Sequence, residues 1–263
     1  MPILEARGVG ISWSEHGEGS CLLLIHESAA TSEVWEPLSE AVTDRARAIS
    51  YDRRGWGSSS APEGYRRTTV EEQSEDAAAL IESIDAGPVV AVGAGVGAVI
   101  ALDVLLRRPG LVAGAVLIEP PLLQLLPVAT EALSDDRRRL EAATAAGEDV
   151  IGLYLSGGLP ALGPGVARLP DGIRSAARGR PAAVIAELGL AAGWRLPLPR
   201  LARVDRPVAI VTATSTPPLL RDASAALARR LRAGSSHELE AGERPPHLGA
   251  PAEVATIAAE LGH

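Results

Sequence analysis

The chain alternates between short, continuous runs of apolar residues and longer segments in which apolar residues recur with helical spacing. The apolar runs lie at residues 21–25, 46–51, 89–92, 115–118 and 207–211. Each run has the length of a strand buried on both faces, as in a parallel sheet covered by helices. Helical patterns follow two of the runs, at residues 70–84 and 98–108. This alternation predicts an α/β fold with a mostly parallel, doubly wound sheet.

One long segment interrupts the alternation. Between Pro120 and about Arg203 there is no strand-like run, and helix-forming stretches at 129–146 and 181–192 are separated by turns such as SGGLPALGPG. A helical insertion between two core strands can cover a pocket at the carboxyl edge of the sheet. We therefore predict a core formed by residues 1–120 and 204–263, with a helical cap at residues 121–203.

Composition narrows the range of partners. The 263 residues carry a formal net charge of −8 without a basic cluster, which argues against nucleic acid. The single Cys21 excludes an intramolecular disulfide and a multi-cysteine zinc site, and we expect neither a metal nor a cofactor. The longest apolar run is shorter than the roughly 20 residues of a membrane helix. Because no signal-peptide pattern opens the chain, we expect a cytoplasmic protein without a membrane partner.

The segment VVAVGAGVGAVIAL at residues 89–102 leads from a strand through a glycine-rich turn into a helix. One interpretation is a dinucleotide site that binds NAD(P), because Gly93, Gly95 and Ala98 fit G-x-G-x-x-A. Glycines there let the backbone approach a pyrophosphate at a helix N-terminus, and Glu119 follows where a ribose-binding acid would fall. A short fingerprint of this kind is weak alone.

The second interpretation depends on residues far from the turn. LLLIHES at residues 22–28, followed by Trp35, is similar to an oxyanion strand and loop. SYDRRGWGSS at residues 50–59 is similar to a Y-D-x-R-G-x-G-x-S segment. In their order along the chain these features resemble the α/β-hydrolase superfamily. The resemblance implies an α/β-hydrolase fold with an inserted helical cap, and it favours the second interpretation of the glycine turn.

The residues of the family's catalytic triad are the points at which this chain departs from the resemblance. The family turn is G-x-S-x-G, and Gly95 stands in place of its nucleophilic serine. The segment TATSTP at 212–217 has no carboxylate where the family acid falls. Glu243 stands directly after Ala-Gly, where the family has its histidine, and His247 follows four residues later. We therefore expect a degenerate triad, and ordinary Ser-His-Asp hydrolysis is not expected.

The resemblance also implies a set of site residues. His247 and Glu119 are the candidate acid-base pair, although His247 could instead anchor its loop and Glu119 could simply end its strand. Backbone N–H groups of Val96 and of Glu27 or Ser28 would form an oxyanion hole. A carboxylate at residue 27, where glycine is usual, is unexpected beside such a hole. The candidate substrate-binding residues are His26, Gly95, Trp35 and Trp194, although single tryptophans are more often core residues.

These features lead to a functional expectation with alternatives. The main hypothesis is a non-hydrolytic, cofactor-independent enzyme of specialised metabolism that abstracts a proton from a hydrophobic, aromatic or polyketide-like substrate. The step would be an oxygenation, with dioxygen as second reactant, or a lyase or cyclase step. The alternatives are a non-catalytic binding protein, an NAD(P)-binding protein, and a hydrolase with a displaced nucleophile, for which the candidates are Ser28, Ser58, Ser59 and Ser60. The sequence does not determine the oligomeric state, and a homodimer is one possibility.

Overall fold

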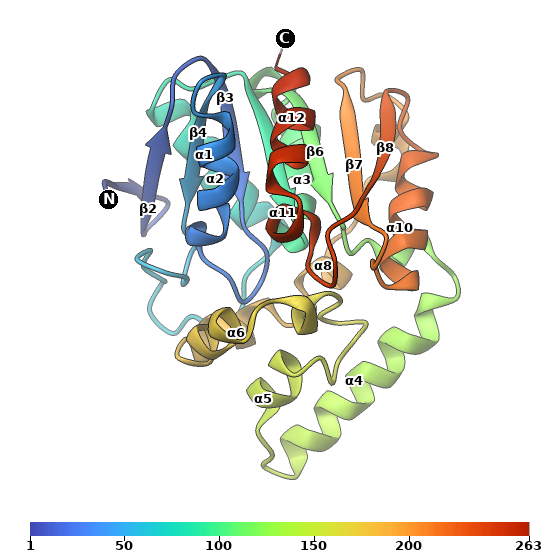
Figure 1. Cartoon of the computed structure of the whole chain (residues 1–263). Coiled ribbons are helices and arrows are strands. Elements are labelled where there is room, and N and C mark those ends of the chain that lie inside the picture. Colours follow the sequence, from blue (N-terminus) through green and yellow to red (C-terminus); the bar gives the residue numbers. More distant parts are fainter. Residues whose placement is uncertain (263) are drawn as a thin grey trace.

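The computed structural model describes residues 1–262, and its centre is an eight-stranded sheet (Figure 1). The strand order is β1-β2-β4-β3-β5-β6-β7-β8, and only β2 runs against the others. The strands are β1 (Ile3–Ala6), β2 (Val9–His16), β3 (Ser20–Ile25), β4 (Ala46–Tyr51), β5 (Val89–Ala94), β6 (Val112–Ile118), β7 (Val208–Ala213) and β8 (Gly234–Leu239). The predicted mostly parallel sheet is confirmed.

The five strands read from apolar runs are β3 to β7, which occupy the interior of the sheet. The three strands that the pattern missed lie toward its two edges, in the order given above. Strand β8 reads GSSHEL and is mostly exposed, so it lacks the apolar continuity of a strand buried on both faces. Its position comes from pairing with β7 rather than from its own hydrophobicity.

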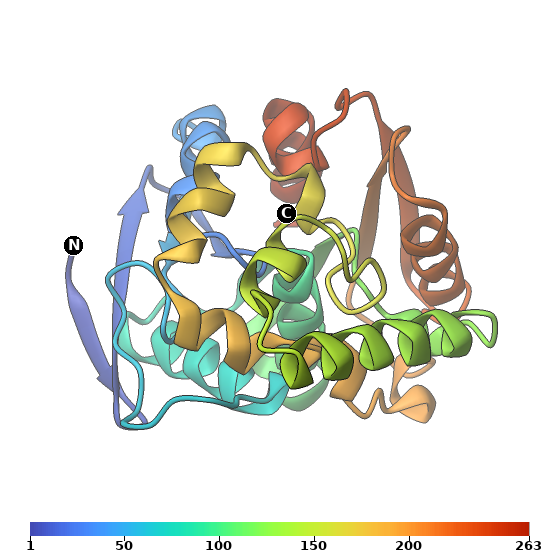
Figure 2. The same cartoon turned by 90° about the horizontal axis from the view of Figure 1, so that it is seen from below.

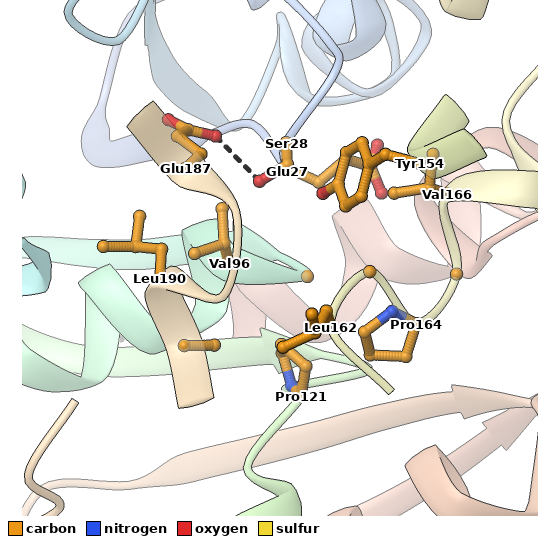
Figure 3. Close-up of a pocket in the computed structure, with 14 residues that line it drawn as sticks. Glu27, Ser28, Val96, Pro121, Tyr154, Leu162, Pro164, Val166, Glu187 and Leu190 are labelled. Atoms are coloured by element: carbon orange, nitrogen blue, oxygen red, sulfur yellow. Dashed lines mark hydrogen bonds between the residues drawn. The ribbon is translucent and has the colours of Figure 1, made fainter. Parts of the chain in front are cut away.

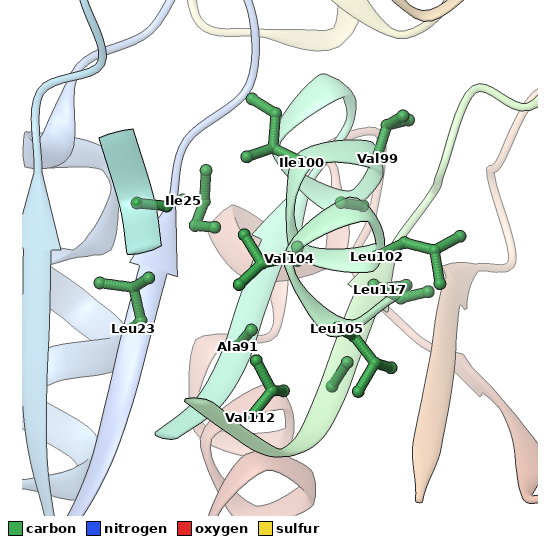
Figure 4. Close-up of a cluster of buried hydrophobic side chains, with 14 of the residues drawn as sticks. Leu23, Ile25, Ala91, Val99, Ile100, Leu102, Val104, Leu105, Val112 and Leu117 are labelled. Carbon is green, nitrogen blue, oxygen red and sulfur yellow. The ribbon is translucent and has the colours of Figure 1, made fainter. Parts of the chain in front are cut away.

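Helices cover both faces of the sheet. Helices α2 (Val70–Ser83) and α3 (Val96–Arg107) pack on one face, and α1 (Glu36–Val42) and α12 (Pro251–Glu260) pack on the other. Figure 4 shows the first core, where leucine, isoleucine and valine side chains of α3 meet those of β3 and β6. Thr69 and Glu72 form a reciprocal capping box that fixes the start of α2. No helix of residues 1–262 combines the length and apolar character that crossing a bilayer requires.

The segment between β6 and β7 is helical. It holds α4 (Ala129–Ala145), α5 (Val150–Leu155), α6 (Asp171–Arg178), α7 (Pro181–Glu187), α8 (Leu190–Gly193) and α9 (Leu198–Leu201). Figures 1 and 2 show α4, α5 and α6 gathered at one edge of the sheet, below it in Figure 1. We call residues 121–203 the inserted segment. The division of the chain into a core and a cap domain at these bounds stays a prediction.

The remaining helices follow β7 and β8. Helix α10 (Pro218–Ala228) comes after β7, and the short α11 (Pro246–Gly249) comes after β8 and directly precedes α12. His247 is in α11, which follows the carboxyl end of β8 after a short loop. It therefore lies at the carboxyl edge of the sheet.

The glycine turn lies at the topological switch point of the sheet. Strand β3 is flanked by β4 on one side and β5 on the other, and ligands of open α/β sheets bind outside the carboxyl ends of such strands. Gly97, in the first turn of α3, faces β3 so closely that an added Cβ would lie 2.1 Å from the carbonyl oxygen of Ile25. Here the glycine serves close packing of the helix against the strand.

This close contact predicts how a substitution at Gly97 changes the free energy of unfolding. Gly97→Ala is expected to lower the free energy of unfolding by about 1–3 kcal/mol, because the methyl group meets rigid backbone. The matched control is Gly172→Ala in α6, where an added Cβ has nothing within 4 Å. Chemical unfolding measures both variants, and equal effects of the two substitutions would contradict the packing account.

Candidate active site

Gly95 forms a sharp turn between β5 and α3. Its φ of 52° and ψ of −122° lie where residues with a side chain are strained, and its N–H donates to the carbonyl of Ile118 at 2.9 Å. In the sheet Ile25 pairs with Gly93, so Glu27 and Gly95, each two residues further on, become neighbours. A Cβ added to Gly95 would lie 3.0 Å from Cβ of Glu27. Glu27 therefore crowds the space into which a side chain at residue 95 would point.

A small cavity opens over this turn (Figure 3). Its volume is about 40 Å³, enough for a few water molecules. Glu27, Ser28, Gly95 and Val96 form one side of the cavity, and every other wall residue belongs to the inserted segment. The chain between β6 and β7 therefore closes the cavity.

The central contact of the site joins Glu27 to His247. The Nε2 atom of His247 lies 2.9 Å from Oε1 of Glu27, and the imidazole is fully buried against Trp35, with 4.9 Å between the ring centroids. Within residues 1–262 the Nδ1 atom of His247 has no hydrogen-bond partner. We assign Nε2 as the nitrogen that donates to the carboxylate, because a proton on Nδ1 would be left unpaired.

Glu119 is not joined to His247. Its carboxylate accepts hydrogen bonds from Arg168 at 2.5 and 2.6 Å and from Thr216 at 2.5 Å. Arg168 belongs to the inserted segment, and it also donates to the carbonyls of Glu243 and Arg244 in the loop before His247. The described contacts therefore place Glu119 in a link between the inserted segment and that loop, and not in the acid-base pair that the sequence predicted.

Backbone donors remain available at the cavity. Val96 is the first residue of α3, so the axial dipole of that helix favours an anion there. In residues 1–262 neither the N–H of Val96 nor that of Ser28 donates to a protein acceptor, and both residues line the cavity. Of the serines considered as displaced nucleophiles, only Ser28 lies at the cavity wall. The predicted oxyanion hole is thus compatible with this geometry and stays a prediction.

The other predicted substrate contacts lie outside the cavity wall. Trp35 is buried beneath His247, and Trp194 packs in the core and donates from Nε1 to Asp103 at 3.2 Å. His26 is buried and uses both ring nitrogens. Its Nδ1–H donates to the carbonyl of Glu27 at 2.8 Å, and Nε2 accepts the N–H of Arg53 at 3.0 Å. None of these three side chains belongs to the cavity wall.

A buried ion pair ties the inserted segment to the site loop. Glu187, at the end of α7, accepts hydrogen bonds from Arg53, from Trp56 at 2.9 Å, from Gln73 at 3.1 Å and from Ser28 at 2.7 Å. Burial raises the pKa of Glu187, but the charge and hydrogen bonds of Arg53 outweigh burial and hold that pKa below its ordinary value. The sequence pattern does not single out Glu187, because a lone glutamate in a helical stretch resembles a solvated residue.

The burial of His26 predicts how the free energy of unfolding depends on pH. Burial, and then the charge of Arg53, hold the pKa of His26 well below the ordinary histidine value. Below about pH 6.5 the unfolded chain binds a proton that the folded chain does not, so folded stability is lost as the pH falls. We expect the free energy of unfolding to fall by roughly 1 kcal/mol per pH unit between pH 6.5 and 5.

Urea unfolding between pH 5 and 7 measures this slope. His26→Gln is expected to flatten it, whereas His16→Gln, at an exposed position of β2, is expected to leave it unchanged. An identical slope in wild type and His26→Gln would contradict the assignment.

Comparison with known proteins identifies relatives of this chain. A family model described as "Alpha/beta hydrolase family" matches residues 16–257. The chain is 32% identical over 227 residues to a 2-(acetamidomethylene)succinate hydrolase of Mesorhizobium japonicum, covering 83% of this chain and 78% of that protein. It is 34% identical over 126 residues to an uncharacterized hydrolase, YraK, of Bacillus subtilis, and this match spans only 45% of that protein.

A solved structure supports the same fold. The structure of an alpha/beta hydrolase from Sphaerobacter thermophilus matches all of this chain and all of that one, with a TM-score of 0.74 and 22% identity. At this level of identity the likeness establishes the fold alone. The expected α/β-hydrolase fold is confirmed.

The relatives correct the main functional expectation. Proteins related to this chain are named hydrolases, including one aligned over most of both chains. The expectation of a non-hydrolytic oxygenation, lyase or cyclase step is therefore wrong. The absence of a serine at residue 95 does not by itself exclude hydrolysis, because the side chain of Glu27 lies beside that position. Within residues 1–262 there is also no cluster of three or more His, Cys, Asp or Glu side chains that could hold a metal ion.

Proposed function

Because the chain belongs to the alpha/beta hydrolase family, we propose that it is a hydrolase that cleaves an acyl bond with a water molecule activated by Glu27. The substrate class is an ester, lactone or amide, in which water attacks a carbonyl carbon. The family's triad is degenerate in this chain. In place of a serine that attacks the carbonyl, Glu27 activates a water molecule that does so.

One observation carries this proposal. The carboxylate of Glu27 lies beside Gly95 and contacts Nε2 of His247 at 2.9 Å. In a serine hydrolase this nitrogen takes the proton of the serine hydroxyl, and a carboxylate on Nδ1 holds the ring in the required tautomer. Here Nδ1 has no partner in the described part of the chain and Nε2 faces a carboxylate. The histidine is therefore suited to orient Glu27 and not to deprotonate a nucleophile.

The proposed reaction has two steps, the attack of water and the departure of the leaving group. Glu27 accepts a proton from water while the water oxygen forms a bond to the carbonyl carbon, and the carbonyl electron pair moves onto oxygen. The oxyanion is stabilised by the backbone N–H groups of Val96 and Ser28. When the tetrahedral intermediate collapses, the bond to the leaving group breaks and the leaving group takes the proton from Glu27. Because Glu27 is neutral while the oxyanion exists, a carboxylate beside the anion site does not repel it.

The proposal is tested with activated p-nitrophenyl esters before and after treatment with a fluorophosphonate probe. We expect steady turnover without a burst of product, no labelling of the protein, and no loss of rate after treatment. Ser28→Ala is expected to retain turnover, because no acyl-serine forms. Labelling of Ser28 together with loss of turnover would replace this mechanism with a displaced serine nucleophile, and no turnover of any acyl substrate would contradict a hydrolase.

A further inference from the structure

We infer that the substrate is an acyl compound without a charged group near its reacting carbonyl. This inference rests on the proposed function, because it concerns the ligand of the same cavity. Three observations support it: the charged side chains of the cavity wall are carboxylates, Arg53 beside the wall is already paired, and Arg168 of the inserted segment is already paired.

The cavity wall contains two carboxylates and no cationic side chain. Glu27 and Glu187 are the charged residues of the wall. Tyr154 contributes a phenol, and burial followed by the nearby Glu187 raises the pKa of that phenol, so it is neutral. The rest of the wall is Ser28 together with aliphatic side chains, prolines and glycines (Figure 3). A bound anion would find no counter-ion.

Arg53, which contacts the wall residues Glu27 and Glu187, already has its charge neutralised. Arg53 is buried, forms the ion pair with Glu187, and donates from Nη2 and Nε to the carbonyls of Glu27 and His26 at 3.0 and 2.9 Å. An anionic ligand could recruit Arg53 only by breaking these contacts. Breaking a buried ion pair leaves its members as uncompensated buried charges, so such recruitment is unfavourable.

Among the described residues, the groove beyond the cavity on the side of α10 is also without a free cation. An apolar groove of about 340 Å³ between the inserted segment and α10 shares Gly163, Pro164 and Gly165 with the cavity wall. Arg168 borders this groove, but its nitrogens donate to Glu119, to Ser215 and to the carbonyls of Glu243 and Arg244. The groove therefore offers apolar contact to an acyl substituent and no charge complement.

These features argue against a substrate that carries a carboxylate near its reacting group, such as the succinate for which one relative is named. A carboxylate in the cavity would lose its hydration, and its only partners would be the two backbone N–H groups that the reaction needs for the oxyanion, which makes its burial costly. It would also lie close to the charge of Glu27. An ammonium group would gain from Glu27, but it would engage the base and lose hydration among aliphatic side chains. An uncharged acyl group avoids both costs.

The test compares three p-nitrophenyl esters of matched length: the butyrate, the succinate monoester and the 4-aminobutyrate. After correction for their uncatalysed rates, we expect kcat/KM for the butyrate to exceed that of each charged ester by at least about tenfold, which corresponds to about 1.4 kcal/mol. A succinate or aminobutyrate ester hydrolysed as well as the butyrate would overturn the inference.

A charge-introducing variant tests the cause. Leu162 lines the cavity and is only partly buried, so Leu162→Arg can place a cation at the wall. We expect this variant to raise the succinate-to-butyrate ratio of kcat/KM at least tenfold, whereas the matched control Leu162→Met leaves it unchanged. The same ratio in both variants would contradict selection by charge.

Binding separates this inference from the proposed function. Calorimetry with butyramide and with succinamate, its anionic counterpart, needs no turnover. If no ester is hydrolysed but butyramide binds in preference to succinamate, the charge inference stands and the hydrolase proposal fails. If esters are hydrolysed but succinamate binds as well as butyramide, the charge inference fails alone. Failure of both amides to bind also overturns the charge inference.

Discussion

Glu27→Gln is expected to lower kcat/KM by about 10²–10⁴-fold, the contribution typical of a positioned general base. Glutamine has the shape of glutamate, and its carbonyl oxygen can still accept the hydrogen bond from Nε2 of His247. It cannot take a proton from water. The variant therefore removes the chemistry while keeping the packing, and its thermal midpoint is expected to stay near that of the wild type.

The matched control is Glu33→Gln, an exposed glutamate six residues further along, in the short helix before α1. It removes the same charge at a site away from the cavity and is expected to leave kcat/KM unchanged. Steady-state kinetics on one activated ester compares the three proteins. Equal activity of Glu27→Gln and wild type would remove Glu27 from the mechanism.

Glu187→Ala is expected to lower the free energy of unfolding by about 3–5 kcal/mol, because it leaves the buried guanidinium of Arg53 without its counter-charge. It also removes the acceptor of the Ser28 hydroxyl and of the Trp56 indole. Glu187 belongs to the inserted segment, while its partners belong to the loops after β3 and β4 and to α2. The substitution is therefore expected to weaken the packing of the inserted segment against these elements. Denaturant unfolding measures the change.

The control for this variant is Glu82→Ala. Glu82 pairs with Arg108 at 3.4 Å on an exposed surface, where solvent screens the interaction. Its removal is expected to leave the unfolding midpoint nearly unchanged. If both variants were equally stable, the network around Glu187 would have no structural importance, and its contact with Ser28 would not hold the site loop.

The fold could be predicted from the sequence because most of its strands carry their own signal. Strands β3 to β7 are buried on both faces and read as continuous apolar runs, and the helical stretch between β6 and β7 is marked by the absence of such runs. Strand β8 could not be found in this way, because its residues are exposed and its position depends on a hydrogen-bonded neighbour.

The site was predictable in part. The order of the motifs placed residues 27, 28, 95 and 96 at one edge of the sheet, and these residues line one cavity. The partnership of His247 was not predictable, since Glu27 is 220 positions away in sequence and its side-chain direction depends on packing. The departure from the usual glycine at residue 27 was the available signal. A carboxylate there is unfavourable to an anion as long as it is charged, and the proposed role of Glu27 as a base follows only from its contact with His247.

Intact-protein mass spectrometry after rapid acid quench, during turnover of p-nitrophenyl butyrate, tests whether Glu27 activates water without an acyl intermediate. We expect only the unmodified protein mass while ester is being consumed. A species heavier by one butyryl group, on Ser28 or on Glu27, would contradict it.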